Sequence, residues 1–158
     1  MDPLKPNSKE RFSDTLDRLE RTSAVAELDN YTQHRGSKTL LHCHNVAVCS
    51  FRMAQALGWR IDERSLATGA LLHDYYLYTF RDEKINFYVH GVSHPRRALK
   101  NAEARFSLNA KERNIIASHM WPLTLFTLPR SKEALLVSLA DKVCALRELR
   151  GNKERESL

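Results

Sequence analysis

The sequence predicts an all-α fold, and three observations support this class. Apolar residues recur at helical spacing in several long segments. Only five Gly and five Pro occur in 158 residues, which favours long regular elements over many tight turns. No internal repeat and no convincing strand pattern is present. We therefore expect one domain over residues 1–158, a single compact bundle of about six or more helices with its core at about residues 30–150.

The first expected helix covers about residues 9–29, where Phe12, Leu16, Leu19 and Val25 recur at near-helical spacing. The stretch TQHRGSKT then forms a loop, and Ser37 is expected to cap a second helix over about residues 38–57. That helix is apolar on most of its surface, so we expect it to be central and buried until Gly58 ends it.

Asp62 is expected to cap a third helix, ERSLATGALLHDYY, which ends near the doublet His73-Asp74. Residues 75–93 are aromatic and irregular in pattern. Their rings either pack as a small lobe over a site or offer one ring for stacking on a base. The next helix is expected to start at Ser93, with Pro95 in its first turn.

Asn109 is expected to cap a further helix, AKERNIIASHM, which stops before Trp121-Pro122. The last helix is expected at about residues 131–150, and Gly151 ends it before a frayed tail at 151–158. The residues expected on its inward face are Leu135, Leu136, Leu139, Val143 and Leu146.

Composition excludes several classes of protein. The hydrophobic fraction of 42% and the charged fraction of 28% are typical of a soluble globular protein. The odd set Cys43, Cys49 and Cys144 contains no C-x-x-C pair, which argues against a disulfide scaffold and a thiolate zinc site. We read these residues as small apolar helix residues. With no signal peptide and no run of about 18 apolar residues, a cytoplasmic location and no membrane partner are expected.

The formal net charge of +6 is compatible with anionic partners such as phosphates. Solubility alone is an equally good explanation, because Lys and Arg are spread along the chain and form no basic block. A nucleic-acid partner is therefore possible but not favoured, and the oligomeric state stays open.

Two acidic residues lie in strongly apolar segments. Asp74 follows GALLH, and Asp141 lies inside LLVSLADKVCAL. A charged Asp is rarely buried unless it is paired or bound to a metal ion. Asp74 could instead lie at the surface where its helix ends, and Asp141 could pair with Lys142 or Arg147. Several His residues on or beside apolar helices favour a metal site, because imidazole and carboxylate are common metal ligands.

The ordered set His42, His73-Asp74, His94, His119 and Asp141 resembles the HD-domain superfamily of metal-dependent phosphohydrolases. The local contexts agree over roughly residues 30–150. They are HCHNVAVCSFRMAQALG, GALLHDYY, HPRRALKNAEARF, IIASH and SLADKVCALRE.

The resemblance implies that His42, His73, Asp74 and Asp141 hold one metal ion. It also implies that Asp74, His94 and His119 hold a second. The cofactor is then one or two divalent ions, among Fe, Mn, Zn, Co, Ni or Mg.

Three His residues stand outside this ligand set. His44 is expected on a partly solvated face, and His34 at the surface. His90 is expected behind the ligands or in contact with substrate.

The implied activity is metal-assisted hydrolysis of a phosphomonoester or phosphodiester of a small, nucleotide-like substrate. Asp74 takes part through the metal ions, and His90 is a candidate general acid. Arg96 or Arg97 and Lys142 are candidates to neutralise phosphoryl oxygens.

The chain lacks the HDIGK pattern of some cyclic-dinucleotide phosphodiesterases, since Leu77 stands where that pattern has Lys. Two alternatives remain open. They are a di-iron oxygenase of the same fold and a metal-stabilised module that binds a nucleotide without turnover.

Overall fold

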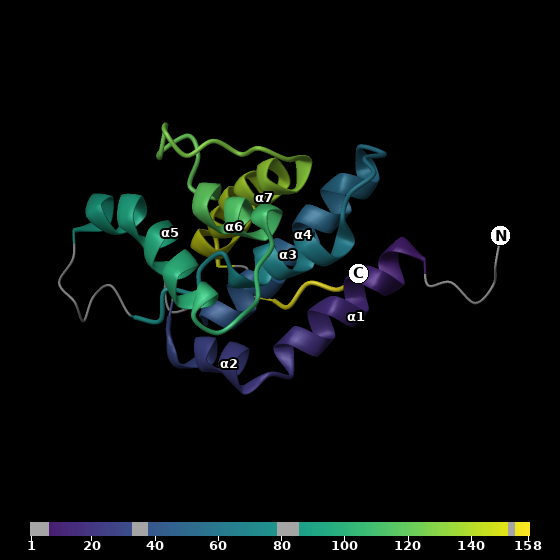
Figure 1. Cartoon of the computed structure of the whole chain (residues 1–158), viewed down its shortest axis with the longest axis horizontal. Coiled ribbons are helices and arrows are strands. Elements are labelled where there is room, and N and C mark those ends of the chain that lie inside the picture. Colours follow the sequence, from purple (N-terminus) through teal and green to yellow (C-terminus); the bar gives the residue numbers. More distant parts are fainter. Residues whose placement is uncertain (1–6, 33–37, 79–85, 152–153) are drawn as a thin grey trace.

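The computed structural model describes residues 7–32, 38–78, 86–151 and 154–158 of the chain. Within these ranges it contains seven α-helices and one short 3-10 helix (Figure 1). The only β pairing among the described residues is an isolated bridge between Thr32 and Lys38. The all-α prediction is therefore confirmed. No helix in the described ranges has both the length and the apolar character needed to cross a membrane.

The N-terminal segment is bent, so the prediction of one helix over residues 9–29 is wrong. Helix α1 (Ser8–Glu20) is followed by α2 (Ser23–Ala26) and η1 (Glu27–Asn30). The Thr22 side chain accepts a hydrogen bond from the Val25 backbone amide and so caps a new helix where the first one ends. The bend lets apolar side chains from both halves reach one core, although a single straight helix fits the same sequence spacing.

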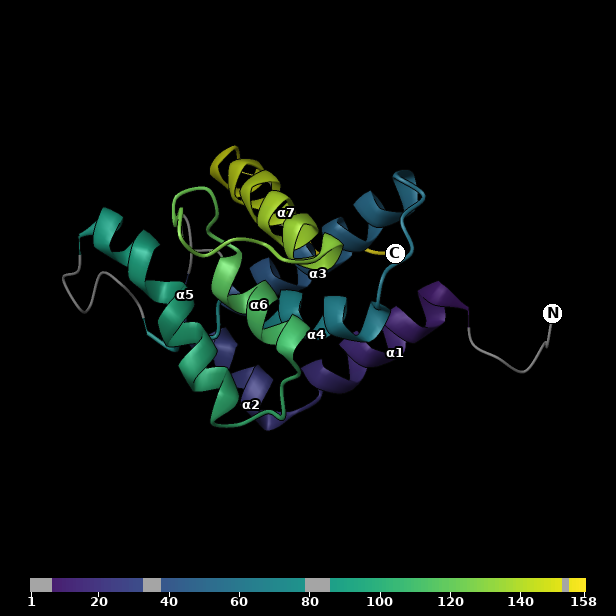
Figure 2. The same ribbon diagram turned by 45° about the horizontal axis from the view of Figure 1, so that its top comes forward.

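Helix α3 (Thr39–Ala56) is central and buried over most of its surface, as predicted. It lies against α7 (Lys132–Leu149) and α4 (Glu63–Leu72), which form the middle of the molecule (Figure 2). Gly58 follows with φ 62°, a left-handed conformation that ends the helix at little cost for glycine. The expected cap at Ser37 lies outside the described residues.

Helix α4 is buried along its length from Ser65 to Leu72. Its N-terminus is capped by Asp62, whose side chain accepts from the Ser65 backbone amide, so that prediction is confirmed. Gly69 lets α4 approach α6 (Ala110–Ser118) closely, because a Cβ atom at this position would lie 2.7 Å from Ile115 side-chain atoms. The close approach brings together the C-terminal ends of the two helices.

Helix α5 (Phe87–Glu103) begins earlier than predicted. Pro95 was expected in its first turn, but it lies inside the helix. Proline is common at helix starts because it lacks an amide proton, and this preference misplaced the boundary. The earlier start puts His90 and His94 on neighbouring turns of one helix. Helix α6 begins at the predicted cap, where Asn109 and Glu112 form a capping box.

Helix α7 begins after Ser131, whose side chain accepts from the Ala134 amide, and the chain turns at Gly151 with φ 95°. Residues 154–158 then run back along α3. The Asn45 side chain binds the Glu154 carbonyl and the Glu156 amide, each at 2.8 Å, and Leu158 packs against the core. The prediction of a frayed tail is therefore wrong for these residues.

Candidate metal centre

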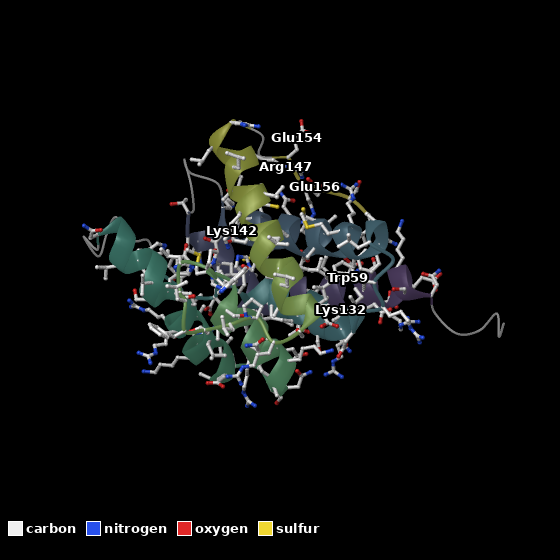
Figure 3. The ribbon with its side chains drawn as sticks, turned by 90° about the horizontal axis from the view of Figure 1, so that it is seen from above. Trp59, Lys132, Lys142, Arg147, Glu154 and Glu156 are labelled. Atoms are coloured by element: carbon white, nitrogen blue, oxygen red, sulfur yellow. The ribbon has the colours of Figure 1, made fainter. Side chains whose placement is uncertain are left out.

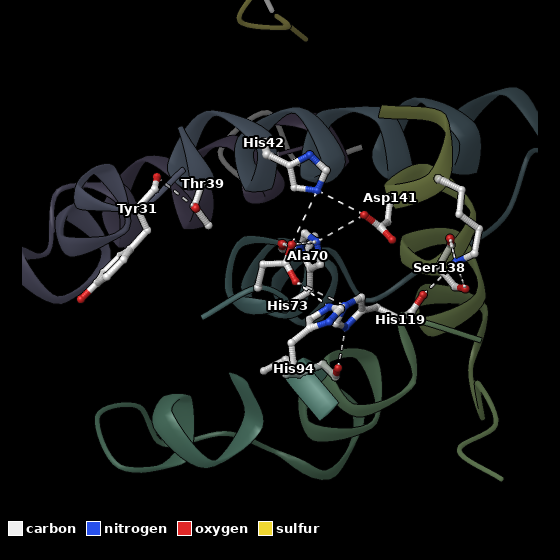
Figure 4. Close-up of polar contacts among 12 residues, drawn as sticks. Tyr31, Thr39, His42, Ala70, His73, His94, His119, Ser138 and Asp141 are labelled. Carbon is white, nitrogen blue, oxygen red and sulfur yellow. Dashed lines mark hydrogen bonds and ion pairs between the residues drawn. The ribbon is translucent and has the colours of Figure 1, made fainter. Parts of the chain in front are cut away.

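Four His and two Asp side chains meet in the interior, each from a different part of the fold except for one adjacent pair (Figure 4). Helix α3 supplies one imidazole in its first turn, the ends of α4 and α6 supply three residues, α5 supplies one and α7 supplies one. The six are His42, His73, Asp74, His94, His119 and Asp141, and all are buried. The structure thus brings together every residue that the sequence singled out as a metal ligand.

Two of the imidazoles belong to the last residues of packed helices. His73 is the C-cap of α4 and His119 is the C-cap of α6, both with helical backbone angles. Because α4 and α6 pack closely at Gly69, their ends lie side by side, and the two rings stand 4.8 Å apart. Local helix ends and one close helix contact therefore build half of the cluster.

The rings of three of these histidines are held by backbone carbonyls one turn earlier. His73 Nδ1 lies 2.7 Å from the Ala70 oxygen, and His94 Nδ1 lies 2.9 Å from the His90 oxygen. His119 Nδ1 lies 2.8 Å from the oxygen of Ile116. A carbonyl only accepts, so Nδ1 carries the proton in each case. Nε2 of each ring faces the cluster and offers a lone pair whenever it carries no proton.

The geometry of His94 and His119 calls for positive charge between them. Their Nε2 atoms are 2.7 Å apart, although both rings already donate from Nδ1. Two lone pairs at that distance repel each other unless a proton or a metal ion lies between them. His73 Nε2, also buried, has no hydrogen-bond partner among the described residues. These donor atoms fit a divalent metal ion.

The two oxygens of Asp74 point at different groups of imidazoles. Oδ2 lies 3.4 Å from His73 Nε2 and 3.8 Å from His42 Nε2. Oδ1 lies 3.2 Å from His94 Nε2 and 3.3 Å from His119 Nε2. Asp141 Oδ1 joins the first group, at 3.1 Å from His42 Nε2. Asp74 therefore stands between two sets of donors, as a carboxylate shared by two ions would.

The two carboxylates make this interior a favourable place for positive charge. Burial opposes ionisation of Asp74, but His73, His119 and His94 together outweigh it and keep the pKa of Asp74 well below its usual value. Burial also opposes ionisation of Asp141, but its hydrogen bond to His42 and the nearby His73 ring together hold the pKa of Asp141 well below its usual value. Without a metal ion, protons on histidine supply the compensating charge.

The surroundings shift the pKa values of the imidazoles in opposite directions. Burial alone lowers the pKa of His42, but hydrogen bonds to Asp141 and Glu148 raise it to about 10. Burial also lowers the pKa of His73, but Asp74 and the other acidic groups around it together outweigh burial and raise that pKa well above its usual value. For His119 burial prevails and lowers the pKa to about 4. His119 is therefore neutral near pH 7, as a metal ligand must be.

An all-helical domain that gathers four imidazoles and two carboxylates in its interior belongs to the class of metal-binding domains. The family model described as HD domain matches residues 39–146, a range that contains all six cluster residues. The chain therefore belongs to the HD-domain family, within the superfamily of metal-dependent phosphohydrolases. No curated protein and no solved structure matches the chain.

Sequence reasoning missed one residue of the site, Glu148. Its Oε1 lies 2.7 Å from His42 Nδ1, and the residue is only 2% exposed. The expected inward face of α7 was wrong in part, because Leu139 and Leu146 are exposed. A usable signal was present, since Glu148 follows Asp141 by seven residues, about two helical turns.

Lys142 was expected to meet phosphoryl oxygens, but its ammonium group is engaged within the protein. Its Nζ donates to the His119 carbonyl at 3.0 Å and to the Ser138 carbonyl and hydroxyl at 2.9 and 3.2 Å. An ammonium group has three protons, and all are used here. In this structure Lys142 ties the end of α6 to α7 (Figure 3 labels its position).

The two arginines after His94 lie in different surroundings. Arg96 lines a largely apolar cavity of about 680 Å³, together with Leu125 and Phe126. None of the six cluster residues is among the described residues that line this cavity, and the role of Arg96 stays a prediction. Arg97 lies over the Tyr78 ring, 4.2 Å from its centroid.

Tyr78 and His90 connect Arg97 with the cluster. The Tyr78 hydroxyl lies 2.9 Å from His90 Nδ1. The His90 ring stacks on His94 with centroids 4.7 Å apart. His90 is thus buried directly behind a cluster residue, and its role as a general acid stays a prediction.

The Tyr residues after Asp74 are buried, and Tyr75 donates to the Ala24 carbonyl, which favours packing over base stacking. Phe80 and the side chains of Phe87 and Tyr88 lie outside what the structure describes.

Predictions were also made for the surroundings of His44, His34 and the three cysteines. His44 was expected on a partly solvated face, but it is buried and bonded to Glu20 and to the Glu156 carbonyl. His34 lies outside the described residues. The three cysteines are free and buried on α3 and α7, which confirms them as packing residues.

Proposed function

We propose that the protein hydrolyses a phosphate ester with one or two divalent metal ions held by the six cluster residues. The observation that carries this proposal is the position of Asp74. One of its oxygens faces His42 and His73, and the other faces His94 and His119. A carboxylate between two groups of imidazoles would suit two divalent ions, which would supply Lewis-acid chemistry to a phosphoryl group.

Divalent ions bound here supply a nucleophilic hydroxide near neutral pH and polarise the phosphoryl oxygens. The chain's own residues prepare the site. The Nδ1 anchors hold three rings with Nε2 directed inward. Asp74 and Asp141 stay ionised and balance the charge of the ions. Burial of all six side chains keeps competing water away from the ligands.

The proposed substrate is a small phosphorylated molecule, with a nucleotide-like compound favoured. Support comes from Arg97, the cation that Tyr78 and His90 connect to the cluster. An arginine there suits a phosphate oxygen, since its planar group donates in pairs. Arg97 therefore replaces Lys142 and Arg96 as the favoured phosphate contact.

The test is a screen of the metal-loaded protein against a panel of nucleotides and other phosphoesters, with Asp74→Asn beside wild type. We expect wild type to release phosphate or cleave a diester. Asp74→Asn should fall to the background rate and lose metal, because the amide lacks the charge and the second anionic oxygen that both ions need.

Asp14→Asn is the matched control, because it makes the same chemical change at an exposed site on α1. It should keep full activity and full metal content by elemental analysis. Full activity in Asp74→Asn would disprove the proposal. Turnover that requires dioxygen and releases no phosphate would favour the oxygenase.

A further inference from the structure

One of the four cluster imidazoles is held differently from the other three. His73, His94 and His119 donate from Nδ1 to carbonyls of their own or the preceding helical turn. His42 instead points its Nδ1 away from α3, to the carboxylate of Glu148 on α7. This ring alone depends on a side chain from another helix for its orientation.

His42 lies in the first turn of its helix. It is the fourth residue of the helix, so the preceding turn ends at the N-cap, Lys38. The Lys38 carbonyl accepts the backbone amide of His42 at 3.1 Å. The His42 ring turns toward α7, where Nε2 meets Asp141 at 3.1 Å and Nδ1 meets Glu148 at 2.7 Å.

We propose that Glu148 is a positioning residue for the metal centre. Its carboxylate accepts the Nδ1 proton of His42, fixes the ring, and so aims Nε2 at the space beside Asp74 and Asp141. Carboxylates behind ligand histidines commonly set the ring orientation and raise the basicity of the ligand nitrogen. The inference rests on metal binding as in the proposed function, but it does not depend on the reaction.

The geometry of α7 supports this role. Asp141 and Glu148 are seven residues apart, which places them on one face of the helix about two turns apart. Helix α7 therefore positions both Asp141, a proposed ligand, and Glu148, which orients the ligand His42. Any shift of α7 along α3 would move both groups relative to His42.

The burial of Glu148 also fits a cationic centre. Glu148 is 2% exposed, and its Oε2 atom has no hydrogen-bond partner among the described residues. A buried carboxylate with one such oxygen is costly unless nearby positive charge compensates it. The adjoining cavity has a volume of about 10 Å³ and is lined in part by Glu154 and Glu156 of the tail. That is space for about one water molecule, and His42 itself is 1% exposed, so bulk solvent does not reach its ring.

The experiment measures Zn²⁺ affinity by competition with a chromogenic chelator, in the absence of any substrate. Glu148→Ala and Glu148→Met should both raise the dissociation constant about 10- to 100-fold, the usual effect of losing such a partner. Methionine fills the same space and favours a helix, so this variant folds where alanine leaves a hole. Glu148→Gln should keep most of the affinity, because its amide oxygen still accepts from Nδ1.

Glu133→Ala is the matched control. Glu133 is a second buried glutamate on α7, but it binds the Asp62 amide and Lys111 at the opposite end of the helix. Its loss should lower stability and leave Zn²⁺ affinity unchanged. In a His42→Ala background, Glu148→Met should cause no further loss of affinity, because its effect acts through His42.

Three outcomes would overturn the inference. They are unchanged affinity in Glu148→Met, an equal loss in Glu148→Gln, or the same loss with and without His42. Normal Zn²⁺ affinities in this series without any hydrolysis by wild type would remove the proposed reaction and leave the role of Glu148 intact. Failure of wild type to bind Zn²⁺ would remove both.

Discussion

At the scale of single residues, the cluster is a set of buried charges that stabilise one another. Asp74 and Asp141 remain ionised in the interior because imidazoles surround them. Neither of the alternatives open from sequence holds, since Asp74 is buried and Asp141 faces His42 rather than Lys142. The site therefore binds positive charge in every state, as protons or as metal ions.

Protonation of His42 in the metal-free protein predicts how its stability depends on pH. The pKa of His42 is about 10 in the folded protein, against its usual value of 6.5. A raised folded pKa contributes stability that is fully present below about pH 6.5 and is lost as pH rises to about 10. Urea unfolding of chelator-treated protein should show that wild type exceeds His42→Gln by less at pH 9.5 than at pH 6.5.

Groups that titrate alike in wild type and in His42→Gln cancel in the difference between their unfolding free energies. A stability difference that is constant or grows over this range would contradict the raised pKa of His42.

At the scale of elements, helix ends position the site. Helices α4 and α6 end at His73 and His119, and the close contact of Gly69 with Ile115 holds these ends together. Helix α5 starts at Phe87, eight residues or about two turns before Pro95, and therefore carries both His90 and His94. The arrangement of these three helices, rather than any local motif, decides the spacing of the imidazoles.

Gly69→Ala tests the contact between α4 and α6. An added Cβ atom would lie 2.7–2.8 Å from three Ile115 side-chain atoms, so the helices must move apart. We expect the free energy of unfolding to fall by about 1–3 kcal/mol, the usual cost of overpacking, although alanine favours helix more than glycine. Urea denaturation measures the change, and Arg64→Ala on the exposed side of α4 should alter it little. A variant as stable as wild type would show that the helices are not in such close contact.

At the scale of the whole molecule, the C-terminal segment, residues 154–158, packs against α3 and α7. The Glu156 carboxylate pairs with Arg52 and Arg147, and its backbone carbonyl lies 2.9 Å from His44 Nε2. Figure 3 labels Arg147, Glu154 and Glu156. Arg155 pairs with Glu20 of α1. These contacts join the two ends of the described chain over the helices that carry His42 and Glu148.

Asn45→Ala should loosen this segment without unfolding the protein. The Asn45 amide bonds the Glu154 carbonyl and the Glu156 amide, and alanine removes both contacts. Hydrogen exchange at the backbone amides of residues 154–158 should become at least several-fold faster, since each lost bond is worth about 1 kcal/mol. Gln55→Ala, on the exposed side of the same helix, should leave exchange unchanged. Equal exchange in both variants would mean that Asn45 does not hold the segment.

The sequence by itself determined the all-α class and the caps at Asp62 and Asn109, and its resemblance to the HD-domain superfamily singled out the six residues of the candidate centre. The class and the caps depend on helical spacing and local hydrogen bonding, and the rarity of buried acids pointed to Asp74 and Asp141, all of which can be read along the chain. The choice of the four histidines came from the resemblance to the family.

Only the tertiary structure decided the bend after Glu20, the return of the tail along α3, and the contact between His42 and Glu148. Residues 106 positions apart form that contact, and no local pattern encodes which acids of α7 face inward. Packing of α7 against α3 turned two leucines outward and two acids inward, because buried imidazoles compensate those charges.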